Sequence, residues 1–201
     1  MWEVRTPGSV QGAPGNRRFY CDGAKRARMK RWLTLLLVLL LPIIGVLGWA
    51  NHLDEPLVQV TKADLVVVEK SKRELTIFSE GAPLKTYRVA LGRVPIGPKS
   101  REGDKRTPEG QYTIDYRKAD SGYFRALHIS YPSQADAQSA RKDGVSPGGD
   151  IMIHGLRNGL AWLGKLHRFV DWTLGCVAVT NKAMEELWRA VPDGTPIKLK
   201  P

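Results

Sequence analysis

Cysteine is scarce in this chain, which has 201 residues and only two cysteines, Cys21 and Cys176. So few cysteines exclude a scaffold held together by disulfides. A structural zinc site needs about four ligands at short spacings, and Cys176 has no second cysteine in its part of the chain. We therefore expect neither a metal nor a cofactor. Internal repeats are also absent from the sequence.

Acidic residues are outnumbered, with 31 Lys or Arg against 20 Asp or Glu and a formal net charge of +11. Residues 1–50 hold eight basic and two acidic residues, and residues 51–201 hold 23 and 18. The modest excess in the second part fits a solvated surface, or attraction to an anionic envelope polymer or membrane. No basic stripe interleaved with aromatic residues is present, so we expect no nucleic-acid partner.

Charge is absent from residues 32–50, an apolar run with a tryptophan at each end. Its length is close to the roughly 20 residues that cross a bilayer core. Basic residues precede the run and acidic residues follow it, which places the N-terminus in the cytoplasm and the rest outside. The expected order is a basic disordered cytoplasmic tail (1–31), a single-pass anchor in the inner membrane (32–50), a linker (51–62) and a domain in the periplasm or cell envelope (63–200).

A cleaved signal peptide is the alternative to an anchor. Gly48-Trp49-Ala50 has the small-x-small pattern of a cleavage site. The apolar run is longer than the usual 7–15 residues of a signal peptide, which favours a retained helix. Met29-Lys30-Arg31 before the run resembles the start of an exported protein, so the start codon could be Met29.

The exported part reads as a single domain, mainly β with one or two short helices. Short β-branched runs separated by Gly, Pro and charged turns predict strands, the first three forming an antiparallel meander. The strands are expected at 64–69, 74–78, 85–91, 111–115, 127–131, 151–154, 176–180 and 195–200. Helices are expected at 134–141 and 182–191, and Asn181 is a suitable cap for the second.

Cys176 and His154 are the candidate reactive pair. Each lies at one end of a short apolar run and beside a glycine, Gly175 or Gly155. If the two runs are neighbouring strands, the imidazole can face the thiol and help to form a thiolate near neutral pH. The amides of Gly175 and Cys176 could then stabilise an oxyanion. This arrangement predicts acyl transfer through a thioester.

Residues 156–172 are expected to form a flap over a substrate groove. Trp162, His167 and Trp172 are its candidate lining, although a histidine in the setting of His167 is more often an ordinary surface or groove residue. His128 is expected in the core or the groove wall, and His52 in the linker has no expected role.

These residues resemble the signature of the L,D-transpeptidase catalytic-domain family (YkuD-like, also labelled ErfK/YbiS/YcfS/YnhG). The signature has a His-Gly, a flap, a Ser/Thr-x-Gly-Cys and an Asn five residues on; here these are His154-Gly155, Thr173-Leu174-Gly175-Cys176 and Asn181. Val-Ala-Leu-Gly at 89–92 and the loop at 103–110 also fit. The resemblance spans about residues 63–200 and implies an L,D-transpeptidase-like β-sandwich. Leu174 stands where many members have His, and Ala178 where many have Arg.

The resemblance implies a peptidoglycan L,D-transpeptidase that acts in cell-wall organisation and cell shape. Cys176 would be the nucleophile and His154 the proton donor and acceptor, with Gly175, Gly155 and Thr173 at the oxyanion and backbone positions and His167, Trp172 and Asn181 in the groove. The cysteine would attack the bond between the third residue and D-alanine of a stem tetrapeptide. An amine acceptor, from a second stem peptide or a lipoprotein lysine, would resolve the thioester.

Three alternatives differ from this prediction. A carboxypeptidase or amidase would use the same pair of residues and pass the acyl group to water. A membrane-tethered wall-binding module would have no active site, which the intact Cys176, His154 and Gly175 disfavour. A papain-like protease would have its cysteine before its histidine, the reverse of the order found here.

Overall fold

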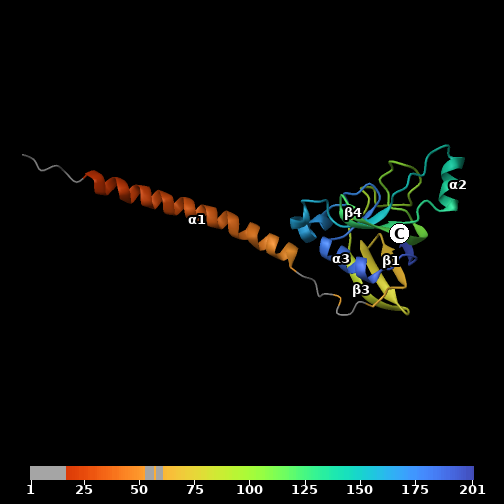
Figure 1. Ribbon diagram of the computed structural model, residues 1–201. Coiled ribbons are helices and arrows are strands. Elements are labelled where there is room, and N and C mark those ends of the chain that lie inside the picture. Colours follow the sequence, from red (N-terminus) through yellow and green to blue (C-terminus); the bar gives the residue numbers. More distant parts are fainter. Residues whose placement is uncertain (1–16, 53–56, 58–60) are drawn as a thin grey trace, which may run out of the picture. The chain divides into compact units, whose positions relative to one another are not determined.

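The computed structural model describes residues 17–52, 57 and 61–201. The chain divides into two compact units, one ending at Val46 and the other spanning Leu47–Pro201. Each unit is described by itself (Figure 1).

Helix α1 spans Arg17–Asn51 and contains Pro42. The expectation of a disordered tail up to residue 31 is therefore wrong from Arg17 onward, because this stretch is rich in Arg, Lys and Ala, which favour helices; residues 1–16 lie outside the described residues. Within α1, Lys25–Asn51 is long and apolar enough to cross a membrane, as a signal sequence near an N-terminus also would be. Retention of this helix as an anchor stays a prediction.

The second unit contains one mixed sheet of eight strands in the order β3-β2-β1-β8-β4-β5-β6-β7. This confirms the mainly β fold with few helices. The strands are β1 (Leu65–Glu69), β2 (Glu74–Ser79), β3 (Ala82–Arg88), β4 (Gly110–Ser121), β5 (Phe124–Ile129), β6 (Met152–His154), β7 (Val177–Ala178) and β8 (Pro196–Lys200). The helices are α2 (Gln134–Lys142), the 3₁₀ segment η1 (Ala161–Phe169) and α3 (Asn181–Ala190).

The predicted antiparallel meander of the first three strands is confirmed, since β1 pairs with β2 and β2 with β3. Strand β8 returns from the C-terminus to lie parallel to β1 and antiparallel to β4. Strand β4 is shared by both halves of the sheet: residues 110–113 pair with β8 and residues 114–121 with β5. It is longer than the predicted 111–115 because pairing with β5 extends it through exposed, charged residues.

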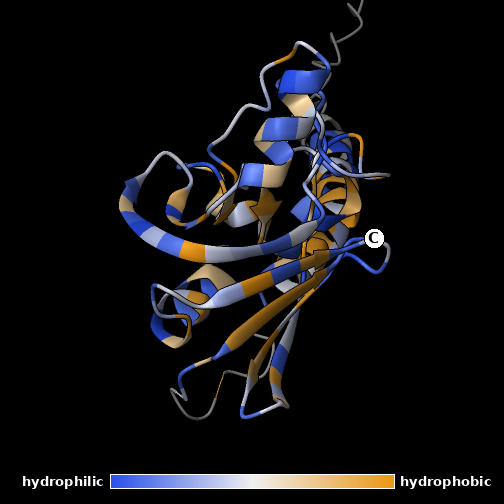
Figure 2. Ribbon diagram, turned by 90° about the vertical axis from the view of Figure 1, so that its right-hand side faces the viewer, coloured by the Kyte–Doolittle hydropathy of each residue, from blue (hydrophilic) through white to orange (hydrophobic). Residues whose placement is uncertain are grey.

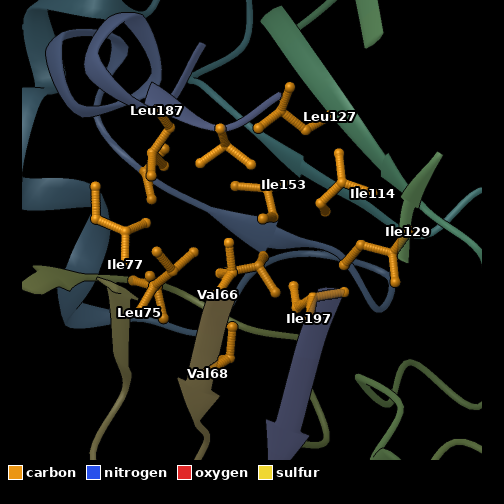
Figure 3. Packing of buried hydrophobic residues seen from close by; sticks show 14 of the residues in the cluster. Val66, Val68, Leu75, Ile77, Ile114, Leu127, Ile129, Ile153, Leu187 and Ile197 are labelled. Atoms are coloured by element: carbon orange, nitrogen blue, oxygen red, sulfur yellow. The ribbon is translucent and has the colours of Figure 1, made fainter. Parts of the chain in front are cut away.

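The core lies where the two halves of the sheet face α3. Val66 and Val68 of β1, Leu75 and Ile77 of β2 and Ile153 of β6 are fully buried and converge with Leu187 of α3 (Figure 3). Hydrophobic residues concentrate along the central strands, while the surrounding loops are largely hydrophilic (Figure 2). This packing fixes the positions of β6 and β7, whose ends carry the candidate reactive residues.

Both short helices begin at side-chain caps. In α2, Ser133 and Asp136 form a reciprocal capping box, so the predicted helix is confirmed. In α3 the cap is Thr180, whose hydroxyl accepts from the Ala183 amide at 3.2 Å. The expectation that Asn181 caps this helix is wrong by one residue, because the Asn181 side chain bonds elsewhere.

Candidate active site

Strands β6 and β7 are neighbours, which meets the condition set for the reactive pair, and they run parallel, with Ile153 opposite Val177 and His154 opposite Ala178. Successive side chains of a strand point to opposite faces of the sheet. Ile153 and Val177 are fully buried in the core, so His154, at the end of β6, and Cys176, directly before β7, project from the other face. Both line one cavity of about 820 Å³. Sheet register therefore brings the predicted pair to one site.

The turn before Cys176 is held by Thr173. Its hydroxyl accepts from the Gly175 amide at 3.1 Å and donates to the Cys176 carbonyl at 2.7 Å. Gly175 has φ of +139°, and a Cβ there would lie 2.7 Å from the Arg106 carbonyl oxygen. Only glycine fits both this backbone conformation and this close approach. The Gly175 amide is thus occupied within the turn rather than free to meet an oxyanion.

The histidine segment is fixed in a similar way. His154 Nδ1 donates to the Gly155 carbonyl at 2.7 Å, which leaves Nε2 of the neutral ring as the proton acceptor. Asn181 Oδ1 accepts from the Leu156 amide at 2.8 Å, and a Cβ on Gly155 would lie 2.7 Å from the same oxygen. Asn181 therefore positions the backbone beside His154 and is not among the residues that line this cavity; its groove role stays a prediction.

Burial sets the resting protonation of the pair. It raises the pKa of the Cys176 thiol, and it lowers the pKa of His154 despite the hydrogen bond to Gly155. The thiol donates to the Asp150 carbonyl oxygen at 3.6 Å. Both pKa shifts favour a neutral thiol and a neutral imidazole. The expectation that the imidazole helps to form a thiolate near neutral pH stays a prediction, and burial by itself favours the uncharged form of each group.

Two aromatic side chains form a wall of the cavity beside His154. The Tyr123 ring lies 4.6 Å from the His154 ring, and the Trp172 ring lies 5.7 Å from it, centroid to centroid. Tyr123 and Trp172 also stack on each other at 6.0 Å. Trp172 was predicted as groove lining. Tyr123 was not, because it lies in the turn between β4 and β5, far along the chain from the motif.

His167 lines the same cavity from η1, within the predicted flap, and its side chain contacts Trp172 edge-on at 6.5 Å between ring centroids. It is only 7% exposed. Among the described residues, neither ring nitrogen of His167 nor the indole nitrogen of Trp172 has a hydrogen-bond partner. Burial, with Arg168 and His154 nearby, lowers the pKa of His167 to about 4. The imidazole is therefore neutral at physiological pH.

The end of the flap is anchored by Asp171, which the sequence did not single out. Its carboxylate accepts two hydrogen bonds from Arg73, at 2.8 and 3.0 Å, and one from the Leu91 amide at 2.9 Å. These contacts hold the segment that leads through Trp172 to Cys176.

The two departures from the family pattern lie in different settings. Leu174 is 68% exposed at the cavity rim. Ala178 is fully buried, and its backbone exchanges two hydrogen bonds with Ala90, so it adds no side chain to the cavity.

His128, which was expected in the core or the groove wall, pairs with Asp115 at 2.6 Å, away from the cavity. Within the described ranges, no group of three His, Cys, Asp or Glu residues lies close enough to hold a metal.

Comparison with known proteins identifies the domain. The family model YkuD, the L,D-transpeptidase catalytic domain, matches residues 63–199. YafK of Escherichia coli K12, itself a provisionally named L,D-transpeptidase, is 27% identical over 179 residues, which cover 81% of this chain and 64% of YafK. The chain thus spans less than two thirds of the length of that curated relative.

Solved structures show the same fold. The helical cell shape determining protein Pgp2 of Campylobacter jejuni has a TM-score of 0.53 at 22% identity, covering 77% of this chain and 54% of Pgp2. A mutant form of Pgp2 gives a TM-score of 0.52 at 23% identity, with coverages of 69% and 47%. Because the family model matches more than half of the sequence, the chain belongs to the YkuD family of L,D-transpeptidase catalytic domains.

Proposed function

We propose that this protein is a peptidoglycan L,D-transpeptidase in which Cys176 is the nucleophile and His154 moves the protons. The observation that carries the proposal is that His154, at the end of β6, and Cys176, directly before the neighbouring β7, line one cavity. A thiol and an imidazole in a shared cavity support nucleophilic acyl transfer. Membership of the family supplies the class of substrate, a peptidoglycan stem peptide.

The first half of the reaction forms the thioester. As Cys176 Sγ attacks the carbonyl of the third stem residue, diaminopimelate or lysine, His154 Nε2 takes the thiol proton. The C–N bond to D-alanine then breaks, and His154 gives that proton to the departing amine. Because the resting pair is neutral, proton transfer accompanies attack. This half requires no cofactor.

The second half transfers the acyl group. The neutral amine of an acceptor attacks the thioester, His154 takes a proton from it, and the C–S bond breaks. The proton then returns to sulfur, which restores the neutral pair. The acceptor is the amine of a second stem peptide or of a lipoprotein lysine.

The proposed oxyanion donor is the amide of Cys176. The Gly175 amide already donates to Thr173 Oγ1, so the role expected for Gly175 becomes one of shaping the turn. Thr173 and Gly155 likewise act on backbone geometry. The stem peptide would lie against Tyr123 and Trp172, which offer flat apolar surface beside His154.

The proposed location is the inner membrane, with the catalytic domain on the periplasmic side. The support is the apolar segment Lys25–Asn51 and the basic residues that precede its apolar core. Peptidoglycan would then be within reach of an enzyme held at the membrane.

Product analysis tests the proposal. The full-length chain in detergent is mixed with disaccharide-tetrapeptide, and the products are identified by mass spectrometry. We expect a dimer that has lost one D-alanine, absent with Cys176→Ala and retained with Cys21→Ala. Tripeptide alone would establish hydrolysis in place of transfer. No Cys176-dependent product would contradict the proposal.

A further inference from the structure

The charged side chains of the active-site cavity are few. Among its described lining residues, Arg93 and Arg157 are cationic and Asp150 is anionic. Most of the remaining lining is apolar or aromatic, including Tyr123 and Trp172. The cavity that holds Cys176 therefore has an excess of positive charge, which attracts an anion.

Arg93 is fixed directly to the segment that carries the nucleophile. Its backbone amide donates to the Thr173 carbonyl at 3.1 Å, and its Nε donates to the Trp172 carbonyl at 3.3 Å. The preceding residue, Gly92, forms a bridge with Thr173. Arg93 is thus tied by both main chain and side chain to the residues just before Cys176. Arg93 and Arg157 are both exposed, but the Arg157 carbonyl accepts from the Leu160 amide at 2.9 Å within the flap and not from the segment before Cys176.

The guanidinium of Arg93 has donors to spare. Several other arginines of the domain form ion pairs with carboxylates: Arg73 with Asp171, Arg88 with Glu74, Arg117 with Asp193 and Arg125 with Glu185. Within the described part of the chain, no carboxylate pairs with Arg93. Its terminal NH₂ groups therefore retain the two-pronged geometry that matches a carboxylate.

Building on the proposed function, we propose that Arg93 binds the carboxylate of the departing residue of the peptide substrate. In a stem tetrapeptide the free carboxylate nearest to the attacked carbonyl belongs to the terminal D-alanine, one residue away. An arginine fixed beside the nucleophile would recognise that group. Arg93 would then be a specificity-determining residue that selects peptides with a single residue beyond the scissile bond.

Alkylation of Cys176 tests whether Arg93 attracts an anion to the thiol, and it does not require turnover. Iodoacetate and iodoacetamide react with the same thiolate, forming a C–S bond and releasing iodide, but only iodoacetate carries a carboxylate. The ratio of their rate constants at one pH therefore cancels the thiol pKa and reports the local charge. The rates are measured by peptide mass spectrometry on the full-length chain in a Cys21→Ser background.

We expect the iodoacetate-to-iodoacetamide ratio of Cys176 to exceed that of free cysteine by roughly a factor of ten. Arg93→Gln should return the ratio to the free-cysteine value. Arg88→Gln, on β3 and outside this cavity, should leave it unchanged. A wild-type ratio equal to that of free cysteine would overturn the proposal, as would an equal fall in Arg88→Gln or a fall in Arg157→Gln without one in Arg93→Gln.

Substrate variation supplies the second test. Wild-type enzyme should lose about tenfold to a hundredfold in kcat/KM when the terminal carboxylate of the tetrapeptide is replaced by a carboxamide. Arg93→Gln should show the same loss on the carboxylate substrate and no further loss on the carboxamide. Continued discrimination by Arg93→Gln would overturn the assignment. If wild-type enzyme cleaves neither peptide while the alkylation ratios behave as expected, the proposed function fails and the carboxylate site stands.

Discussion

Asn181 Oδ1 accepts a hydrogen bond from the Leu156 amide at 2.8 Å. This contact joins the residue five positions after Cys176 to the segment that follows His154. It also places the Asn181 side chain where a Cβ on Gly155 would have to lie. The asparagine of the motif thus fixes the backbone next to His154.

Replacing Asn181 should therefore act through His154. Asn181→Leu leaves the Leu156 amide without its acceptor, which costs about 1–3 kcal/mol and lets the His154 segment move. We expect kcat to fall at least tenfold with little change in KM. Asn181→Asp keeps an acceptor oxygen and should remain close to wild type in both thermal unfolding and kinetics. Equal losses in the two variants would contradict the positioning role.

Gly175 should tolerate no side chain. Gly175→Ala meets both an unfavourable φ of +139° and the Arg106 carbonyl oxygen, so the turn that presents Cys176 must shift and turnover should be lost. The matched control is Gly81→Ala, which has φ of +78° but open space around the added Cβ. We expect the control to lose about 1 kcal/mol of stability and no activity. An active Gly175→Ala enzyme would show that the close approach to Arg106 is not needed.

The pH dependence should follow from a neutral thiol and a neutral imidazole. Because burial lowers the pKa of His154 and raises that of Cys176, kcat/KM should fall on the acid side only below the ordinary histidine pKa of about 6.5. Iodoacetamide labelling of Cys176 should have its midpoint above the ordinary thiol pKa of about 8.5. A labelling midpoint near neutral pH would instead show a resting thiolate paired with imidazolium.

His167 should make stability depend on pH. Its folded pKa of about 4 lies below the unfolded value of about 6.5, so the unfolded state binds more protons between these values. Stability is therefore lost as pH falls through this window, by up to roughly 3 kcal/mol. His167→Phe removes both the titration and two unpartnered buried nitrogens. We expect it to be at least as stable as wild type at pH 7 and clearly more stable at pH 4.5. Parallel stability curves for the two proteins would contradict this.

The sequence alone predicted the fold correctly where short local patterns determine the structure. Alternating β-branched runs predicted the first meander. The predicted reactive pair depended on the condition that the apolar runs beside His154 and Cys176 are neighbouring strands, and β6 and β7 do pair. Once the two strands are paired, side-chain alternation places the pair on one face.

The rest depends on contacts between segments far apart in the chain. Tyr123 reaches His154 from the β4–β5 turn, and the Arg106 carbonyl lies behind Gly175 from a loop about 70 residues earlier in the sequence. No periodic pattern marks such contacts. The burial that shifts the pKa values of Cys176 and His154 likewise depends on which segments cover the site. Asn181 was assigned to a helix cap because its type suits one, but Thr180 occupies that position.

The most direct test of the account is the mass of the enzyme during turnover. Full-length protein is mixed with disaccharide-tetrapeptide, quenched in acid within the first turnovers, and digested for peptide mapping. We predict that the peptide containing Cys176 gains the mass of the donor minus D-alanine. The adduct should be lost on treatment with hydroxylamine, as a thioester is, and absent from Cys176→Ser and His154→Ala. Release of D-alanine with no adduct on Cys176, or an adduct elsewhere, would contradict the assignment of Cys176 as the acyl carrier.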